Sequence, residues 1–129
     1  MPARIRTVAS QENGCNRVQG VIPLLTKLLK EDVGVKTAYL CRDNVDQVYK
    51  TDVEGHHFCG YRNIQMLLSS NTRNSTETGA MLDHSILKLQ SLIEEAWAAG
   101  INSEGLIETG GILDTRKHIG TSEVRIAIS

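Results

Sequence analysis

Aromatic residues are scarce in this chain: one Trp, one Phe and three Tyr make up 4% of its 129 residues. A core with so few aromatic rings must be built mainly from Leu, Ile and Val. No apolar run approaches the ~18 residues that a membrane-spanning helix requires. The N-terminus also lacks the apolar stretch of a signal peptide, so we expect an intracellular protein, located in the cytoplasm, the nucleus or both.

Cysteine is similarly limited. Cys15, Cys41 and Cys59 form an odd count with no C-x-x-C pair. This pattern argues against a disulfide framework and a zinc knuckle, and it leaves room for a free reactive thiol.

Neither sign of charge is in excess. Lys and Arg total 14 and Asp and Glu total 15, which gives a net charge of −1. Such a chain has no electrostatic reason to bind nucleic acid or an anionic membrane, and neither is predicted as a partner. With 40% apolar residues, the length suits one packed domain.

Apolar spacing predicts three or four helices. The first begins near Val21 and is ended by Gly34, and the second follows Gly60. The third covers 83–99, where apolar residues recur every three or four positions and indicate a core-facing stripe that ends in Trp97. The last is expected to start with Thr121 as its N-cap.

The rest of the chain is expected to be less regular. Residues 1–20 are polar and without period, which favours a flexible arm. Residues 35–41 are short and rich in β-formers, and they are predicted to form a strand. An irregular segment (42–58), a loop (71–79) and a glycine turn (109–111) complete the pattern.

Cys59 is the first candidate for chemistry. It directly precedes the second predicted helix, where unpaired backbone N–H groups and the helix dipole stabilise a thiolate. Gly60 would let a substrate backbone approach, and the N–H of Cys59 could donate to an oxyanion. The alternative is a buried cysteine that acts as a small apolar residue.

Metal and cofactor sites are not predicted. His56, His57 and Cys59 lie close in sequence and Cys41 is a possible fourth ligand, but adjacent histidines rarely reach one ion. The glycines of 109–111 lack the spacing of a P-loop, so a plain turn is expected there.

The segment Cys59–Ser69, CGYRNIQMLLS, resembles the nucleophile motif of a family of cysteine peptidases. That family includes ubiquitin-fold-modifier-specific proteases and the zinc-finger-containing deubiquitinase. Residues 89–97 and 108–123 resemble the helix and the turn that follow in the family, and the likeness covers about 20–129. The resemblance implies an α+β papain-like fold, of which 21–129 supplies mainly the helical N-terminal part of the catalytic domain, with few strands.

The resemblance also implies roles. Cys59 would be the nucleophile that attacks an isopeptide or peptide carbonyl after the C-terminal Gly of ubiquitin or a ubiquitin-like modifier, whose conjugates would be the partners. In some relatives a Tyr twelve residues before the nucleophile supports the oxyanion. That position is Gln47 here, whose amide can also donate a hydrogen bond, and Tyr49 is the rival.

The family's general-base His and its Asp lie beyond the region that corresponds to 120–123. We therefore expect a chain that is truncated relative to the family, with an exposed apolar face on Ile64, Leu67 and Leu68. The chain's own histidines do not match the catalytic position: His56, His57, His84 and His118, of which His118 is expected to be half-buried.

Two functions from different classes follow from the resemblance. One is a thiol isopeptidase or deubiquitinase-like enzyme. The other is a catalytically inactive relative that binds a ubiquitin-like protein, or an inactive fragment. Arg62 and Asn63, on the first helical turn, are expected to cap the helix and anchor a loop rather than contact substrate.

Overall fold

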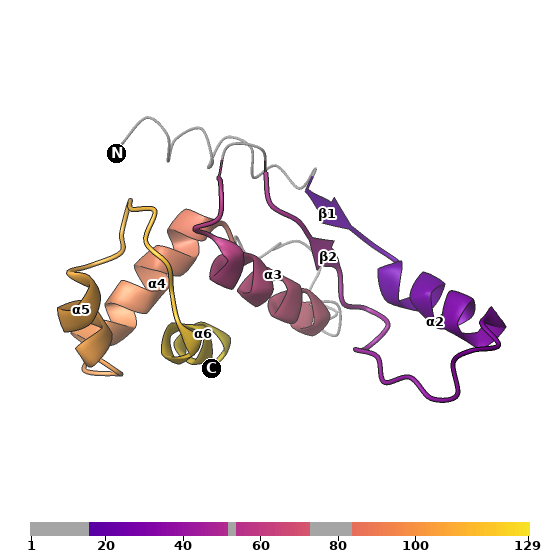
Figure 1. Ribbon diagram of the computed structural model, residues 1–129. Helices are drawn as coiled ribbons and strands as arrows, with labels where there is room; N and C mark the ends of the chain where they lie inside the picture. Colours follow the sequence, from indigo (N-terminus) through magenta and orange to yellow (C-terminus); the bar gives the residue numbers. More distant parts are fainter. Residues whose placement is uncertain (1–15, 52–53, 73–83) are drawn as a thin grey trace.

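The computed structural model describes residues 16–51, 54–72 and 84–129, which form a mainly helical body and one small sheet (Figure 1). Five helices and two short strands lie in these ranges, which confirms the predicted α+β class with few strands. Their order along the chain is β1 (Arg17–Val18), α2 (Val21–Glu31), β2 (Gln47–Val48), α3 (Cys59–Thr72), α4 (Ile86–Ala98), α5 (Glu104–Thr109) and α6 (Thr121–Ile128).

The core lies between α3, α4 and α6 (Figure 1). The apolar stripe predicted on α4 is confirmed, because Ile86, Leu89, Ile93 and Trp97 are all buried. Helix α3 contributes buried side chains from its first two turns, and partly buried residues of α6 pack against the same cluster. The helix that carries Cys59 is therefore fixed by the packing of its first turns.

Two polar side chains of α4 hold the segment that runs from α5 to α6. The Glu94 carboxylate accepts hydrogen bonds from the N–H groups of Ile112 (2.7 Å) and Leu113 (2.9 Å). Gln90 accepts from the Asp114 N–H at 3.0 Å and donates to the Thr115 carbonyl at 2.9 Å. The turn predicted at 109–111 begins this segment, with positive φ at both of its glycines.

The strands are not where the sequence indicated. The prediction of a strand over 35–41 is wrong, since these residues have no regular structure and most of them are exposed. Instead Arg17–Val18 pairs antiparallel with Gln47–Val48, with Arg17 opposite Val48. One strand thus lies within the predicted arm and the other within the predicted irregular segment.

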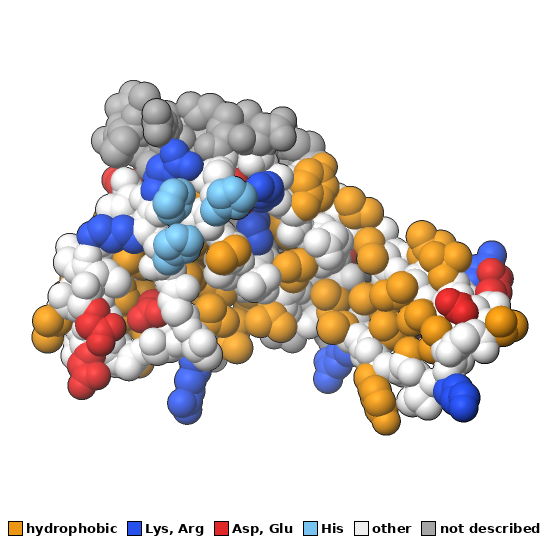
Figure 2. All heavy atoms as spheres, in the orientation of Figure 1, with side chains coloured by type: hydrophobic (Ala, Val, Ile, Leu, Met, Phe, Trp, Pro, Cys, Tyr) orange, Lys and Arg blue, Asp and Glu red, His pale blue; other side chains and the backbone are white. Residues whose placement is uncertain are grey.

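Helix α2 has no buried residue and lies away from the body formed by α3 to α6 (Figure 1). Three of its four leucines are exposed, among them Leu24 (58%) and Leu28 (54%), and Leu29 is half-buried. The apolar face predicted on α3 is only partly exposed: Leu67 is 50% exposed, but Ile64 is completely buried and Leu68 is partly buried against the core. Exposed apolar side chains therefore occur both on and around α2 and on the helical body (Figure 2).

Three helix ends differ from, or refine, the sequence prediction. Helix α2 stops at Glu31, before Gly34, because Asp32 takes an extended conformation. Gly100 closes α4 as predicted, with φ of 85°. Thr121 is the first residue of α6 rather than its cap; the cap is Gly120, whose N–H donates to the Glu123 carboxylate at 2.8 Å.

Residues 1–15, with Cys15, and most of the predicted loop at 71–79 lie outside the described residues. None of the helices within the described ranges combines the length and apolar character that would let it cross a membrane.

Candidate active site

Cys59 is the first residue of α3, and its side chain is exposed. The Phe58 carbonyl accepts the first helical hydrogen bond, from the Arg62 N–H at 3.1 Å. The N–H groups of the residues before Arg62 therefore precede the helical hydrogen-bond ladder, at the positive end of the helix dipole. On either side of Cys59, Phe58 and Tyr61 are buried with their rings edge to face, 5.8 Å apart between centroids. These two anchors fix the start of α3 and leave the thiol facing outward.

The Cys59 side chain lines a hollow of about 200 Å³. Helix α3, strand β2 and the loop between them supply its walls, which are formed by Val48, Lys50, Glu54, Gly55, His56, Cys59, Arg62, Asn63 and Met66. A larger groove of about 860 Å³ lies between α4 and α6, but Cys59 does not line it. The chemistry of the thiol therefore points to the smaller hollow as the candidate site.

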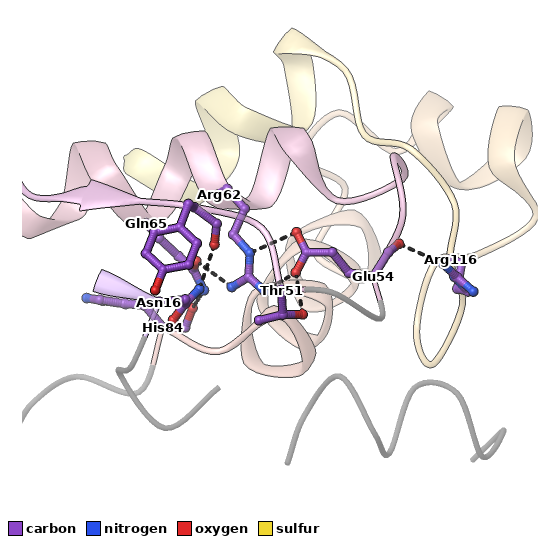
Figure 3. Close-up of polar contacts among 8 residues, drawn as sticks. Asn16, Thr51, Glu54, Arg62, Gln65, His84 and Arg116 are labelled. Carbon is purple, nitrogen blue, oxygen red and sulfur yellow. Dashed lines mark hydrogen bonds and ion pairs between the residues drawn. The ribbon is translucent and has the colours of Figure 1, made fainter. Parts of the chain in front are cut away.

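A buried ion pair joins the wall of this hollow to the loop before α3. Glu54 is 1% exposed and Arg62 is 4% exposed, and the Arg62 Nε donates to one Glu54 carboxylate oxygen at 3.2 Å (Figure 3). A second, shorter contact joins Arg62 Nη2 to the other oxygen, which also accepts from the Thr51 hydroxyl at 3.0 Å. Arg62 thus anchors the loop, as the sequence predicted.

The ion pair also governs the ionisation of Glu54. Burial by itself would raise the pKa of this carboxyl, but the hydrogen bonds and the charge of Arg62, with hydrogen bonds from Thr51, outweigh it. The pKa of Glu54 consequently lies below its ordinary value, and the carboxylate is charged at neutral pH.

Arg116 ties the same loop to the segment before α6. Its Nη2 donates to the Glu54 carbonyl at 2.6 Å, a contact between residues 62 positions apart in sequence (Figure 3). The Arg116 guanidinium lies so close to Gly55 that a Cβ there would be 3.0 Å from Nη2, and Gly55 also has a φ of 68°. The loop that leads to Cys59 is therefore held from two sides.

Gly60 has a different role from the predicted one. A Cβ at this position would lie 2.7 Å from Ile119 Cγ1 and 3.3 Å from the Ile119 carbonyl oxygen. The missing side chain thus makes room for Ile119, and the space expected for a substrate backbone is occupied by the protein itself. The prediction for Gly60 is wrong, and it is wrong because the contact comes from the other end of the chain.

Gln47 and Tyr49 both lie at β2, next to the hollow. Side chains alternate along a strand, and Val48 is the buried one, packed toward α3, while Gln47 and Tyr49 are exposed. Val48 and Lys50, rather than Gln47 or Tyr49, line the hollow that contains Cys59. The role of Gln47 as an oxyanion donor stays a prediction.

The histidines near Cys59 come from two parts of the chain. His56 lines the hollow, and the rings of His57 and His118 lie 5.0 Å apart between centroids. His118 is exposed, so the expected half-buried position is wrong; the residue packs on another histidine instead of entering the core. His84 lies two residues before α4, and its carbonyl accepts from Gln65 at 2.7 Å. In Figure 2 histidine side chains gather beside Lys and Arg on one face of the helical body.

Sequence reasoning placed Cys59 at a helix start and predicted the anchoring role of Arg62, but it missed the contacts of Glu54 and Arg116. Glu54 lies in a segment with many charges, where no periodicity marks a buried carboxylate. The one available signal was the position of Glu54 eight residues before Arg62. The predicted helix start lies between the two residues, so an ion pair between them would join the loop to the helix. Among the described residues, no group of three His, Cys, Asp or Glu could hold a metal ion.

Comparison with known proteins adds an independent line of evidence. Residues 34–129 match the model of peptidase family C78. The human zinc finger-containing ubiquitin peptidase 1 is 30% identical over 122 residues, which cover 92% of this chain and 21% of that protein. The ubiquitin carboxyl-terminal hydrolase mug105 of Schizosaccharomyces pombe is 33% identical over 96 residues, covering 70% of this chain and 39% of that protein. The chain therefore spans about a fifth of the length of the zinc-finger relatives that it matches.

Proposed function

This chain belongs to peptidase family C78, and from that premise we propose that Cys59 is the nucleophile of a thiol peptidase site for ubiquitin or a ubiquitin-like modifier. Family membership and the helix-rich α+β structure agree with the papain-like fold expected from the sequence. The similar proteins of known name are ubiquitin peptidases, which supports the choice of substrate class.

One observation carries the proposal: Cys59 is an exposed cysteine at the first position of a helix, and Phe58 and Tyr61 on either side of it are buried. The N–H groups at such a helix start stabilise a thiolate, which is the reactive form of cysteine. The same groups are donors for the oxyanion that forms when sulfur adds to a carbonyl.

The proposed reaction proceeds through a thioester. The Cys59 thiolate attacks the carbonyl carbon of the C-terminal Gly of the modifier, and the carbon–nitrogen bond breaks as an acid protonates the leaving amine. Water then hydrolyses the thioester, which frees the carboxylate of the modifier and regenerates the thiol. The resemblance assigns the general base to sequence that follows 120–123 in the family.

Gln47 is proposed as a further oxyanion donor on the strength of the resemblance alone. β2 packs on α3, so the strand that carries Gln47 lies against the helix that carries Cys59, and the Gln47 amide has the N–H donor that this role needs. Replacing Gln47 with Ala should slow reaction with a substrate by about tenfold or more if it donates this bond. Tyr49→Phe is the parallel variant for the rival donor.

The decisive experiment uses ubiquitin and ubiquitin-fold-modifier probes that carry a C-terminal electrophile. Such a probe reacts with the thiol directly and has no amine to protonate, so it reports on the nucleophile and the modifier-binding surface separately from the base. We expect an adduct by intact mass, lost in Cys59→Ala and retained in Cys41→Ala. Cys41 is the matched control because it is also an exposed free cysteine but lies outside a helix.

The second function, a binding module without catalysis, has its own outcome in this experiment. A folded chain that forms no adduct with either probe would exclude the enzyme proposal. If that chain still shifted the NMR signals of ubiquitin, the binding module would take its place.

A further inference from the structure

We propose that Glu54 is a positioning residue for Cys59: its buried carboxylate fixes the loop before α3 and cancels the positive charge of Arg62 beside the thiol. This inference rests on the proposed function, because it assigns Glu54 a task only if Cys59 is the nucleophile. It adds a residue that lies five positions before the nucleophile motif and outside it.

Every polar group of Glu54 is engaged. Its two carboxylate oxygens accept from Arg62 and from the Thr51 hydroxyl, and its N–H donates to the Thr51 carbonyl at 3.3 Å. Its own carbonyl accepts from Arg116 at 2.6 Å. A residue held in this way, five positions before the start of α3, fixes the path of the chain into Cys59 (Figure 3).

The charge argument begins with the position of Arg62 on α3. Residues three apart on a helix lie on the same face, and Cys59 and Arg62 both line the hollow. The Arg62 guanidinium is buried, and a positive charge near a thiol favours the thiolate. Paired with Glu54, the guanidinium keeps its hydrogen bonds but contributes little net charge at Cys59.

Glu54 is the one acidic side chain among the described residues that line the hollow. The other charged or titratable groups on its walls are Lys50, His56, Arg62 and the thiol itself. His57, His118 and Arg116 belong to the loop and segment packed beside it. Apart from Glu54 and the thiol, the charged or titratable groups among the described lining residues are all basic.

A thiolate held by an unbalanced positive charge is more abundant but intrinsically less nucleophilic. The neutral pair avoids that loss, so that ionisation of the thiol depends on the catalytic base rather than on Arg62. The structure thus combines rigid placement of the helix start with a charge-neutral Glu54–Arg62 pair beside the thiol.

The test measures the alkylation rate of Cys59 by iodoacetamide as a function of pH. Cys15→Ser and Cys41→Ser are combined in the full chain so that Cys59 is the one remaining thiol. Removal of the negative charge in Glu54→Gln should move the midpoint of the pH profile down by about one unit. Removal of the positive charge in Arg62→Gln should move it up by about half a unit. A purely structural pair would not give shifts of opposite sign.

Two further variants separate charge from structure. Arg62→Lys keeps the charge and loses the two-pronged contact, so it should lower stability with little change in midpoint. Asp46→Asn is the matched control. Asp46 is also a buried acidic residue, 3% exposed, and it pairs with Arg17 at 3.8 Å, but it does not line the hollow. The Asp46 N–H donates to the Ser69 hydroxyl, which lies about 15 Å along α3 from Cys59. The midpoint of the alkylation profile should therefore not change in this variant. His56→Asn removes the titration of that ring from the profile.

Circular dichroism establishes first that each variant is folded. Midpoints that move in the same direction, or that stay within about 0.2 units of the parent in both charge variants, would overturn the proposal. Failure of both charge variants to fold would overturn it as well, since the pair would then be structural alone. Because alkylation needs no modifier, a chain inert to ubiquitin probes but with opposite shifts would refute the proposed function and leave the electrostatic effect in place.

Discussion

Gly105→Ala should destabilise the protein although alanine is the better helix former. Gly105 is a buried residue of α5, and a Cβ there would lie 2.7 Å from Trp97 Cζ2 and 2.8 Å from Glu123 Oε1. Ordinary carbon contacts are about 3.5–4.0 Å, so the methyl group overlaps atoms of both α4 and α6. Trp97 is 2% exposed, so movement of its ring away from the methyl group would disturb the neighbouring core.

The magnitude follows from two opposing effects. Replacing Gly by Ala in a helix gains up to about 1 kcal/mol. Overpacking a core of this kind costs about 1–3 kcal/mol, and displacement of Glu123 also weakens its hydrogen bond to Gly120 at the start of α6. We expect a net loss of about 1–2 kcal/mol, which lowers the melting temperature by about 4–8 °C.

Urea unfolding followed by circular dichroism at a helix wavelength measures this loss. Gly100→Ala is the matched control, because Gly100 has a φ of 85° but no atom within 4 Å of its added Cβ. That variant should lose about 1 kcal/mol from backbone strain without overlap. Trp97→Phe, which removes the indole atoms nearest the methyl group, should cost less in the Gly105→Ala background than in the parent. A Gly105→Ala protein as stable as the parent would refute the packing at this position.

Three further predictions concern α3. Because the pKa of Glu54 is lowered, the ionised carboxylate stabilises the fold fully above the ordinary pKa of 4.5, and this stabilisation is lost as the pH falls through the lowered pKa. The urea midpoint of Glu54→Gln should therefore depend less on pH below 4.5 than that of the parent. Burial raises the pKa of Tyr61 from 10.0 to about 12, so the free energy of unfolding should fall as pH rises between these values. Tyr61→Phe should remove that dependence, and equal slopes in both proteins would contradict it. Gly60→Ala should lower the melting temperature and slow Cys59 alkylation through its overlap with Ile119, with partial recovery in Gly60→Ala/Ile119→Ala; an unchanged alkylation rate would show that Ile119 does not set the position of the helix start.

Features that depend on a short stretch of chain could be predicted. The apolar stripe of α4 is a local periodicity, which by itself predicts a helix with one face toward the core. The position of Cys59 at a helix start likewise depends on a few neighbouring residues. Both are found in the structure.

Features that depend on distant partners could not be predicted in this way. Residues 35–41 have strand-like composition, but a strand also needs a neighbour, and in the described residues β2 pairs with Arg17–Val18 instead. The sequence likewise showed apolar residues in both α2 and α3. It did not show which of these helices packs against the rest of the chain. Ile64 is buried because α4 and α6 cover it, whereas the leucines of α2 remain exposed.

The candidate site shows the same division. A motif of consecutive residues located Cys59, but the groups that surround it come from four separate places: β2, the loop before α3, α3 itself and the segment before α6. The contacts of Arg116 and Ile119 reach back about 60 positions along the chain. Only the folded chain shows that Ile119 fills the space beside Gly60 and that Arg62 neutralises the charge of Glu54.

The separation of α2 from the helical body has a consequence for local stability. An isolated helix of 11 residues is only marginally stable in water, and α2 buries none of its side chains in the described structure. Its amide protons should therefore exchange with deuterium through frequent local opening, while those of α3 and α4 exchange only when the core opens. The protein would then have two levels of protection, and Trp97, the single tryptophan, would report on the core alone. A fluorescence melt and a hydrogen-exchange map would accordingly describe different parts of one chain.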